Sequence, residues 1–291
     1  MRFSIITPSF KQPDWLKLCI SSVKDQVSLD FEVEHIVQDG GSPDIIQIFP
    51  EIESEGYSFR LFSENDNGMY DAINRGLQRS SGEICAWLNC DEQYLVGTLA
   101  KVANFFKLNP QIDMLFGDAL LIDKSGLSLS YRKAIKPDQR HIKASHLNTL
   151  SCATFFRRNV FEKYGMLDVG WKIIGDAVWV DHLIAVGVKM AVLNELLSVF
   201  TWLPENLSNT QQAESEISQW KSQCGSSCRF KKWNAIITHR LRKLKSGAYR
   251  VREIQYAVYT RDSTNKRRGF QRRVGWKWPR YNKINLRHEK G

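Results

Sequence analysis

The sequence predicts an α/β protein whose mostly parallel central sheet is flanked by helices and followed by a basic, helical C-terminal extension. Short apolar runs alternate with segments of helical periodicity through the first 200 residues, and this alternation favours right-handed crossovers between parallel strands. The apolar runs contain few polar residues, as is typical of strands that are covered on both faces. The composition becomes strongly basic after about Ser215, where the extension begins.

Strands are predicted where apolar runs end in turn residues. They lie at residues 3–7, 31–38, 59–62, 84–88, 112–116, 152–157 and 189–193. Helices are predicted where apolar residues recur every three or four positions. They lie at residues 13–23, 43–55, 69–79, 95–108, 159–164 and 176–187. A hairpin around Lys124-Ser125-Gly126 is expected over residues 119–136.

Charge is divided unevenly along the chain. Residues 221–291 hold 21 Lys or Arg against three acids, a net charge of +18, whereas the first 220 residues have a net charge of −8. We therefore expect one domain at residues 1–214 and a basic, aromatic-rich extension at 215–291. Within the extension, residues 229–257 could form amphipathic helices, and residues 261–291 show no clear period.

Such a concentration of positive charge predicts an anionic partner for the extension, either a membrane surface, a phosphate-bearing acceptor or nucleic acid. Trp, Tyr and Phe lie among the Lys and Arg residues, a mixture that favours a membrane interface. A solvated extension without a partner is the alternative. Nucleic acid is disfavoured because no nucleic-acid-binding module is recognisable.

Cellular location follows from what the sequence lacks. The start of the chain has too short an apolar run for a signal peptide, and no stretch approaches the roughly 18 apolar residues of a membrane span. Cys224 and Cys228 are the only closely spaced pair among six cysteines, which is too few ligands for a zinc site. We therefore expect a cytoplasmic protein with reduced thiols, which the extension could place on the inner face of the cell membrane.

Polar clusters follow three of the predicted strands. They are Thr7-Pro8-Ser9-Phe10, Asp39-Gly40-Gly41-Ser42 and Asn89-Cys90-Asp91-Glu92, with an acidic block at 64–76 between the last two. The carboxyl ends of parallel strands meet at one edge of a sheet, where ligands bind. Carboxylates gathered there repel each other unless a cation lies among them, and oxygen ligands suit Mg²⁺ or Mn²⁺. Because such ions commonly bridge diphosphate oxygens, these residues predict a nucleotide-diphosphate site.

These segments resemble family 2 glycosyltransferases, which have the Rossmann-like GT-A fold. The resemblance covers about residues 3–210, and its motifs occur in the expected order. They are Ile5-Ile6-Thr7-Pro8-Ser9, Gln38-Asp39-Gly40-Gly41-Ser42, the block 66–76, Trp87-Leu88-Asn89-Cys90-Asp91-Glu92, Ala153-Thr154-Phe155-Phe156-Arg157-Arg158 and Tyr164-Gly165-Met166-Leu167-Asp168. They match a bacterial subgroup that builds exopolysaccharide, capsule and O-antigen. The resemblance implies inverting transfer from a nucleotide sugar, with a uridine diphosphate sugar the expected donor, to a glycan or lipid-linked acceptor.

The resemblance also implies roles for single residues. Asp91 matches a ligand of Mg²⁺ or Mn²⁺, and Asp176 matches the catalytic base. The residues expected to bind the nucleotide sugar are Thr7, Pro8, Ser9, Asp39, Asp66, Gly68, Asp71, Asn74, Asn89 and Asp118. Each role has a plainer structural alternative: Asp39 and Asp118 as turn residues, Asp71 and Asn74 as one solvated helix face, and Asp176 as a helix cap.

The chain departs from the subgroup's pattern at two positions, Glu92 and Val178. Asn89 stands where the family's short acidic motif has its first acid, as is usual in the subgroup, whereas Glu92 replaces the acid that often follows Asp91. Val178 occupies the second position of a pair of acids near the base, and Asp181 lies too far along the helix to replace it. The missing acid keeps open a non-catalytic protein that binds nucleotide sugars or lipid-linked glycans. A dinucleotide-dependent oxidoreductase is disfavoured because no Gly-x-Gly-x-x-Gly follows the first strand.

Overall fold

The computed structural model describes residues 1–203, 206, 210–223 and 229–279. Its centre is a 10-stranded sheet with the order β3-β4-β2-β1-β5-β9-β7-β10-β6, with β8 paired to β7. The strands are β1 (Arg2–Ser9), β2 (Glu32–Asp39), β3 (Ile52–Ser54), β4 (Tyr57–Ser63), β5 (Ile84–Trp87), β6 (Glu92–Tyr94), β7 (Met114–Ile122), β8 (Ser128–Arg132), β9 (Thr154–Arg157) and β10 (Met190–Thr201). Strands β4, β2, β1 and β5 run parallel, and β9 lies antiparallel between β5 and β7.

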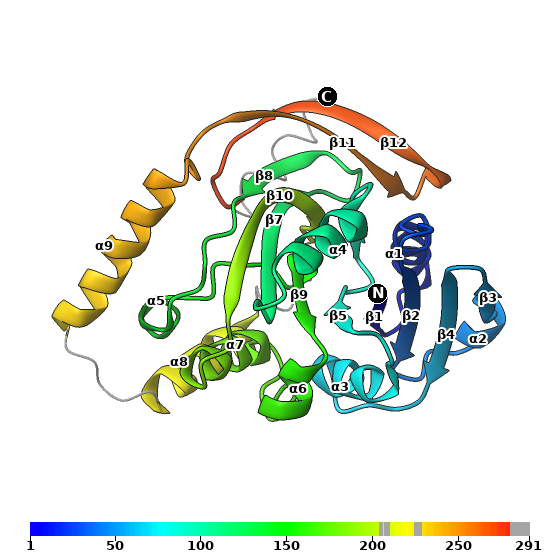
Figure 1. The fold of residues 1–291 in the computed structure, drawn as a ribbon, viewed down its shortest axis with the longest axis horizontal. Coiled ribbons are helices and arrows are strands. Elements are labelled where there is room, and N and C mark those ends of the chain that lie inside the picture. The colour runs from blue at the N-terminus through cyan, green and yellow to red at the C-terminus, as the bar shows by residue number, and fades with distance from the viewer. Residues whose placement is uncertain (204–205, 207–209, 224–228, 280–291) are drawn as a thin grey trace.

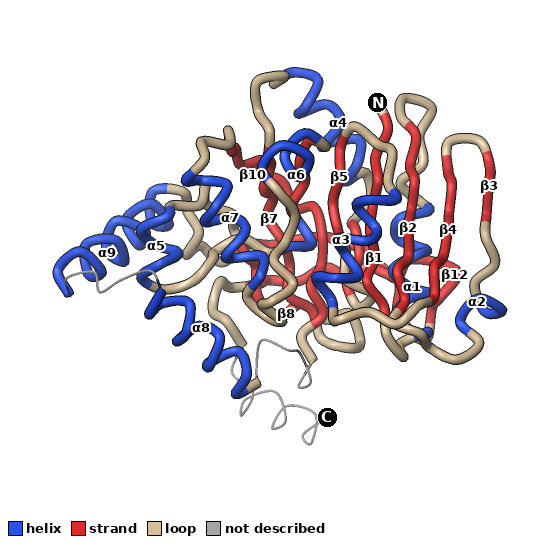
Figure 2. Tube along the Cα trace, turned by 90° about the horizontal axis from the view of Figure 1, so that it is seen from below, coloured by secondary structure: helices blue, strands red, loops and turns tan. Residues whose placement is uncertain are grey.

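Helices cover both faces of this sheet (Figures 1 and 2). Helices α1 (Pro13–Lys24) and α4 (Thr98–Leu108) pack on one face. Helices α3 (Met69–Arg79), α6 (Asn159–Tyr164), α7 (Gly175–Ala185) and α8 (Gln211–Gln223) contribute to the apolar cluster on the other face. The expected α/β class with helices on both faces of the central sheet is therefore confirmed.

Close packing on the second face depends on a small residue in α3. A Cβ atom added at Gly76 would lie 2.4 Å from Cγ2 of Ile6 on β1, closer than carbon atoms approach in a packed core. Gly76 thus lets α3 lie directly on β1 and β2. This contact brings the N-terminus of α3 to the edge where β1 and β2 end.

One predicted helix is wrong. Residues 43–55 form the four-residue helix α2 (Ile45–Ile48), and the short strand β3 then pairs antiparallel with β4. Pro50 explains the difference, because proline has no backbone N–H and its ring clashes with the preceding helical turn.

The C-terminal extension contains both helices and strands. Helix α9 (Arg229–Lys245) is followed by a hairpin of β11 (Arg252–Thr260) and β12 (Ser263–Val274), so the helix predicted to continue to residue 257 ends earlier. Residues 261–279 of the segment without a clear period are described and largely form β12, and residues 280–291 lie outside the description. Two short elements, α5 (Gln139–Ala144) and the 3₁₀ helix η1 (Ser151–Ala153), complete the chain.

The hairpin packs against the first domain and arches over α1 and β8 (Figure 1). The side chain of Gln93 bonds both backbone groups of Tyr259, at 2.9 and 2.8 Å. Arg267 donates to the carboxylate of Asp25 and to the carbonyl oxygen of Tyr94. The change in composition near residue 215 therefore does not separate the extension in space. None of the helices in the described part of the chain is long and apolar enough to cross a bilayer.

Candidate active site

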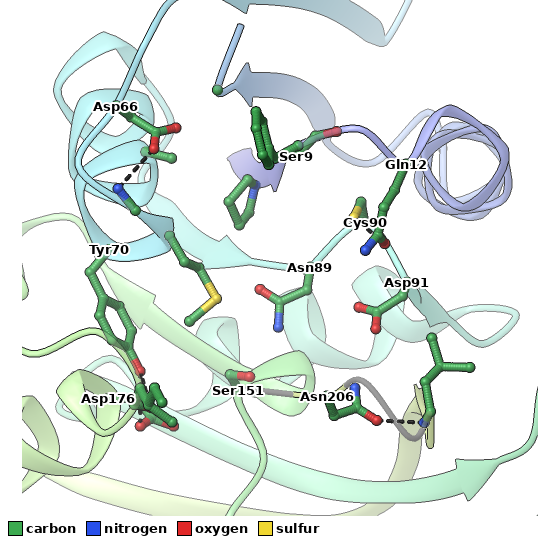
Figure 3. A pocket seen from close by; sticks show the side chains of 18 of the residues that line it. Ser9, Gln12, Asp66, Tyr70, Asn89, Cys90, Asp91, Ser151, Asp176 and Asn206 are labelled. Atoms are coloured by element: carbon green, nitrogen blue, oxygen red, sulfur yellow. Dashed lines mark hydrogen bonds between the residues drawn. The ribbon is translucent and has the colours of Figure 1, made fainter. Parts of the chain in front are cut away.

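A cavity of about 1000 Å³ opens at the carboxyl ends of β1, β2 and β5. Its walls also include the N-termini of α3 and α7, the start of η1 and the end of β10. Figure 3 shows that polar side chains from these separate segments point into one space. Seven of the residues predicted from the sequence line it: Pro8, Ser9, Asp66, Gly68, Asn89, Asp91 and Asp176.

The loop after β1 contributes Ser9 but not Thr7. Thr7 is fully buried in the sheet, where its hydroxyl lies 2.9 Å from Nε2 of His35. Ser9 lies on the cavity wall, and its hydroxyl is buried without a hydrogen-bond partner among the described residues. The loop therefore presents an unpaired hydroxyl to the cavity, while Thr7 holds two strands together.

The loop after β2 reaches the cavity through Gly40 and Gly41. Asp39 itself is fully buried and accepts hydrogen bonds from the backbone N–H of Ser42 at 2.6 Å and from its hydroxyl at 2.9 Å. Gly41 has a φ of +89°, which glycine adopts without strain. Asp39 thus shapes the turn that presents two glycines, as its alternative interpretation as a turn residue requires.

Residues 65, 66, 68–70 and 72 of the acidic block line the cavity, whereas Asp71 does not. Asp66 accepts from the N–H of Gly68 at 2.8 Å, and both residues line the wall. Asp71 accepts from the N–H of Asn67 at 2.9 Å and pairs with Arg75.

Asn74 lies outside the cavity lining and connects two parts of the body. Its side-chain N–H donates to the carbonyl of Leu167 at 2.7 Å, and its oxygen accepts from the N–H of the same residue at 3.2 Å. This pair of hydrogen bonds fastens α3 to the segment that leads toward α7.

The segment after β5 directs two neighbouring acids to different places. Asp91 lines the cavity together with Asn89, and both side chains point into it (Figure 3). Glu92 is fully buried and accepts from the N–H of Asn89 at 2.8 Å. Burial in apolar surroundings raises the pKa of Glu92 well above its usual range. Glu92 therefore supports the loop from behind, and Asp91 is the acid that a ligand can reach.

Asp176 lies at the N-terminus of α7, across the cavity from Asn89 (Figure 3). Its carboxylate accepts from the N–H of Ala177 at 2.8 Å and lies 3.3 Å from the hydroxyl of Tyr70. That hydroxyl also donates to the carbonyl of Ile173 at 2.7 Å. Burial raises the pKa of Asp176 above its ordinary value. The residue is thus a partly buried carboxylate held in place by two neighbours.

Two other acids are engaged away from the cavity. Asp118 is fully buried and accepts from the hydroxyl of Tyr131 at 2.6 Å and from the N–H of Ala134 at 2.8 Å. It lies within β7 rather than at a turn, and it joins that strand to the segment after β8. Asp181 pairs with Lys143 at 3.4 Å, so it points elsewhere, as its spacing from Asp176 predicts.

Several cavity residues were not predicted. Tyr70, Thr149, Phe200 and Trp278 line the wall. Trp278 comes from the C-terminal extension, and its ring packs edge-on against that of Trp202 with 5.2 Å between the ring centroids. The aromatic residues of the extension were noticed in the sequence, but nothing there indicated that one of them would return to the cavity.

Unpaired polar atoms make the cavity suited to a polar ligand. Besides Ser9, the side-chain oxygens of Asn89 and Thr149 are buried and lack a hydrogen-bond partner within the described part of the chain. A buried polar group left without a partner costs about 1–3 kcal/mol. A ligand that supplies hydrogen bonds or a cation at these atoms would recover this free energy.

The residues present fit a divalent cation that would take most of its oxygen donors from a bound phosphate group and from water. Across the described residues, no group of three or more His, Cys, Asp or Glu side chains is placed to hold a metal. Asp91 and the unpaired oxygen of Asn89 nevertheless offer two hard oxygen donors in the cavity. Mg²⁺ in proteins is often bound by one or two carboxylates together with water and phosphate oxygens, which is the set that this wall could complete.

Solved structures with the same fold come from glycosyltransferases. S. aureus TarS in complex with UDP-GlcNAc matches 84% of this chain and 73% of its own, with a TM-score of 0.55 and 14% identity. The mannosyltransferase PcManGT from Pyrobaculum calidifontis, in complex with GDP-Man and Mn²⁺, matches 85% of this chain and 75% of its own, with a TM-score of 0.53 and 14% identity. At this identity the likeness establishes the GT-A fold.

Sequence relatives point in the same direction. A PGL/p-HBAD biosynthesis glycosyltransferase of Mycobacterium tuberculosis is 29% identical over 177 residues, which is 60% of this chain and 66% of the relative, just under two thirds of its length. An uncharacterized glycosyltransferase of Rickettsia felis is 30% identical over 136 residues, 46% of this chain and 22% of the relative. The family model of glycosyl transferase family 2 matches residues 4–165, more than half of the chain. The protein is therefore a member of glycosyl transferase family 2.

Proposed function

We propose that this protein transfers a sugar from a uridine diphosphate donor to a hydroxyl of a glycan or lipid-linked acceptor, with inversion at the anomeric carbon. The observation that carries the proposal is the placement of Asp91 and Asp176 on the wall of one cavity at the carboxyl ends of parallel strands. Family membership supports glycosyl transfer as the reaction class. The resemblance of the sequence motifs to the bacterial subgroup described above supports a role in cell-surface polysaccharide synthesis.

The donor would occupy the side formed by the loops after β1 and β2. Gly40 and Gly41 allow the backbone to approach a nucleotide closely, and the unpaired hydroxyl of Ser9 offers a hydrogen bond. TarS and PcManGT share this fold and were solved with UDP-GlcNAc and GDP-Man, respectively, which supports a nucleotide diphosphate sugar as the donor. The roles of Asp66, Gly68 and Asn89 in donor binding are part of the same proposal.

Asp91 and Asn89 would hold Mg²⁺ or Mn²⁺ against the donor's diphosphate. The cation would neutralise the charge that develops on the leaving diphosphate. Glu92 has no part in this site because it is turned into the core behind Asn89.

Asp176 would act as the base. Its carboxylate takes the proton of the acceptor hydroxyl while that oxygen forms a bond to the anomeric carbon. The bond from that carbon to the diphosphate oxygen breaks, and the nucleoside diphosphate leaves with the electron pair. The raised pKa of Asp176 suits this task, because a base works best when its pKa is near the operating pH. Tyr70 and the N–H of Ala177 fix the direction of the carboxylate.

The test combines a binding assay with a turnover assay. Thermal-shift screening of nucleotide sugars with and without Mn²⁺ identifies the donor, because a ligand stabilises the folded state that binds it. The donor should still stabilise Asp176→Asn, whereas the kcat of this variant should fall by a factor of about 10²–10⁴. Asp91→Asn should lose the Mn²⁺-dependent part of that stabilisation. Asp30→Asn, at an exposed acid outside the cavity, is the matched control and should change neither.

A non-catalytic binding protein is the second candidate, and Val178 favours it because a second acid is missing there. A wild-type protein that is stabilised by a nucleotide sugar but neither transfers nor hydrolyses it would establish this alternative. A protein that no nucleotide sugar stabilises would contradict both candidates.

The cellular setting belongs to the same proposal. We place the protein in the cytoplasm, associated with the inner face of the cell membrane through its basic extension. Fractionation of cells that express the full chain, followed by a salt wash of the membrane fraction, tests this placement because electrostatic attachment weakens as ionic strength rises.

A further inference from the structure

Helix α9 lies at the end of the molecule opposite β3, as both views show (Figures 1 and 2). Its inward side is small and polar. Ala235 and His239 are buried, and the ring of His239 stacks on that of His141 in α5 with 3.6 Å between centroids. Arg242 reaches Asp138 at 3.9 Å. Polar and stacking contacts, together with one alanine, thus attach α9 to the body.

The outward side of α9 is apolar. Phe230, Trp233, Leu241 and Leu244 expose 70, 63, 54 and 63% of their surface. Together with the half-buried Ile237 they recur every three or four residues, so they share one face of the helix. We name this surface, formed by residues 230, 233, 237, 241 and 244, the outer face. A helix on a protein surface normally turns its apolar stripe toward the core, and α9 does the opposite.

Positive charge flanks the outer face. Helix α9 contains seven Lys or Arg residues and no acid. Arg240 and Lys245 are exposed and lie beside the outer face, whereas the exposed Lys231 and Lys232 lie nearer the opposite side of the helix. An apolar stripe with exposed Lys and Arg beside it is the pattern of a helix that lies in the plane of a lipid interface, where anionic headgroups meet the cations.

We propose that the outer face of α9 inserts into the headgroup region of a membrane that contains anionic phospholipid. The face of one helix, rather than the net charge of the whole extension, would then determine attachment. A second copy of the chain is a poor occupant, because seven cations on each helix would repel each other. Nucleic acid would pair with the cations but leave five apolar side chains in water. A lipid interface satisfies both parts of the surface.

The inference rests on the membrane attachment proposed above but not on the proposed sugar transfer, so it is tested by binding alone. The full chain is sedimented with vesicles of phosphatidylcholine and with vesicles of equal parts phosphatidylcholine and phosphatidylglycerol. The wild-type protein should bind the second kind more tightly. The double variant Trp233→Gln with Leu241→Gln should bind those vesicles roughly tenfold or more weakly, because the buried apolar area decreases. Arg240→Gln should weaken binding about fivefold.

The matched control removes two exposed apolar side chains elsewhere. Leu29 and Val96 expose 98 and 66% of their surface, and Leu29→Gln with Val96→Gln should bind vesicles like the wild type. Thermal unfolding of both double variants verifies that they fold. The proposal is overturned if the wild type does not bind anionic vesicles, or if the Trp233 and Leu241 variant binds them as tightly as the control. A dimer in sedimentation velocity that the same variant dissociates would also overturn it.

Discussion

Removal of the Tyr70 hydroxyl tests whether Asp176 is positioned as a base. This hydroxyl has one proton and lies 2.7 Å from the carbonyl oxygen of Ile173 and 3.3 Å from the Asp176 carboxylate. Its hydrogen bond lowers the pKa of Asp176, against the larger opposing effect of burial. Tyr70→Phe should therefore raise that pKa further and leave the Ile173 carbonyl without this partner.

The size of the expected shift in the pKa of Asp176 follows from the geometry of this hydrogen bond. An ordinary hydrogen bond contributes about 0.5–1.5 kcal/mol, and a shared contact of 3.3 Å belongs at the lower end. About 0.5 kcal/mol corresponds to roughly 0.4 pKa unit. A base must be deprotonated to act, so activity falls as pH falls through its pKa. In Tyr70→Phe this fall should begin at a pH about 0.4 unit higher. The free energy of unfolding should decrease by about 1 kcal/mol because of the unpaired carbonyl.

The assay is the pH dependence of kcat/KM, measured beside thermal unfolding. Tyr164→Phe removes a hydroxyl from α6, outside the cavity lining, and serves as the matched control. An acidic limb that moves to lower pH in Tyr70→Phe would refute the assignment of Asp176 as the base. A lower unfolding temperature with an unchanged limb would mean that Tyr70 only supports the fold.

Three further predictions concern stability and the extension. Burial raises the folded-state pKa of Asp176, so the charged carboxylate destabilises the folded protein. This destabilisation grows as pH rises from about 3.9 through the folded-state pKa. Asp176→Asn should therefore unfold at a higher temperature than the wild type at pH 7, but not near pH 3. Gly175→Ala would place a Cβ 2.6 Å from Cε2 of Tyr70; it should cost about 1–3 kcal/mol in thermal unfolding and lower kcat, and an unchanged melting temperature would contradict this. Arg267→Ala should speed chymotrypsin cleavage in the hairpin, because Arg267 bonds the hairpin to Asp25 and Tyr94. Lys266→Ala, at an exposed position, should leave the cleavage rate unchanged.

The predictability of each element depended on how clear its apolar pattern was. The run 84–88 was predicted as a strand and forms β5 (Ile84–Trp87), and the helix predicted at 159–164 is α6. In β11, Ile254, Tyr256 and Val258 alternate with more polar residues, a period of two that indicates a strand. The helical prediction over residues 229–257 overlooks this signal. Strand β12 carries few apolar residues, so its conformation depends on pairing with β11, which local sequence does not reveal.

The site was predictable as a place but less so as a set of contacts. Parallel strands bring their carboxyl ends together whatever their side chains, so the clusters that begin at Thr7, Asp39 and Asn89 were expected to meet. Whether a side chain faces the cavity depends on the geometry of each turn. Both carboxylate oxygens of Asp39 accept hydrogen bonds from Ser42, and the hydroxyl of Thr7 lies beside the ring of His35. Trp278 reaches the cavity only because the hairpin packs on the body, a long-range contact that local patterns do not encode.

Burial, rather than residue type, distinguishes the acids around the cavity. Glu92 is enclosed by the core, and its strongly raised pKa means that it would be protonated at pH values where an ordinary carboxyl group is charged. Such a group is a poor cation ligand, although it adjoins Asp91 in the motif. Asp176 is only partly buried, and its pKa is raised while two hydrogen bonds still favour the charged form. Acids in environments that separate their pKa values commonly take separate roles in catalysis. The same reasoning supports the roles proposed above, with Glu92 as loop support, Asp91 as a cation ligand and Asp176 as the base.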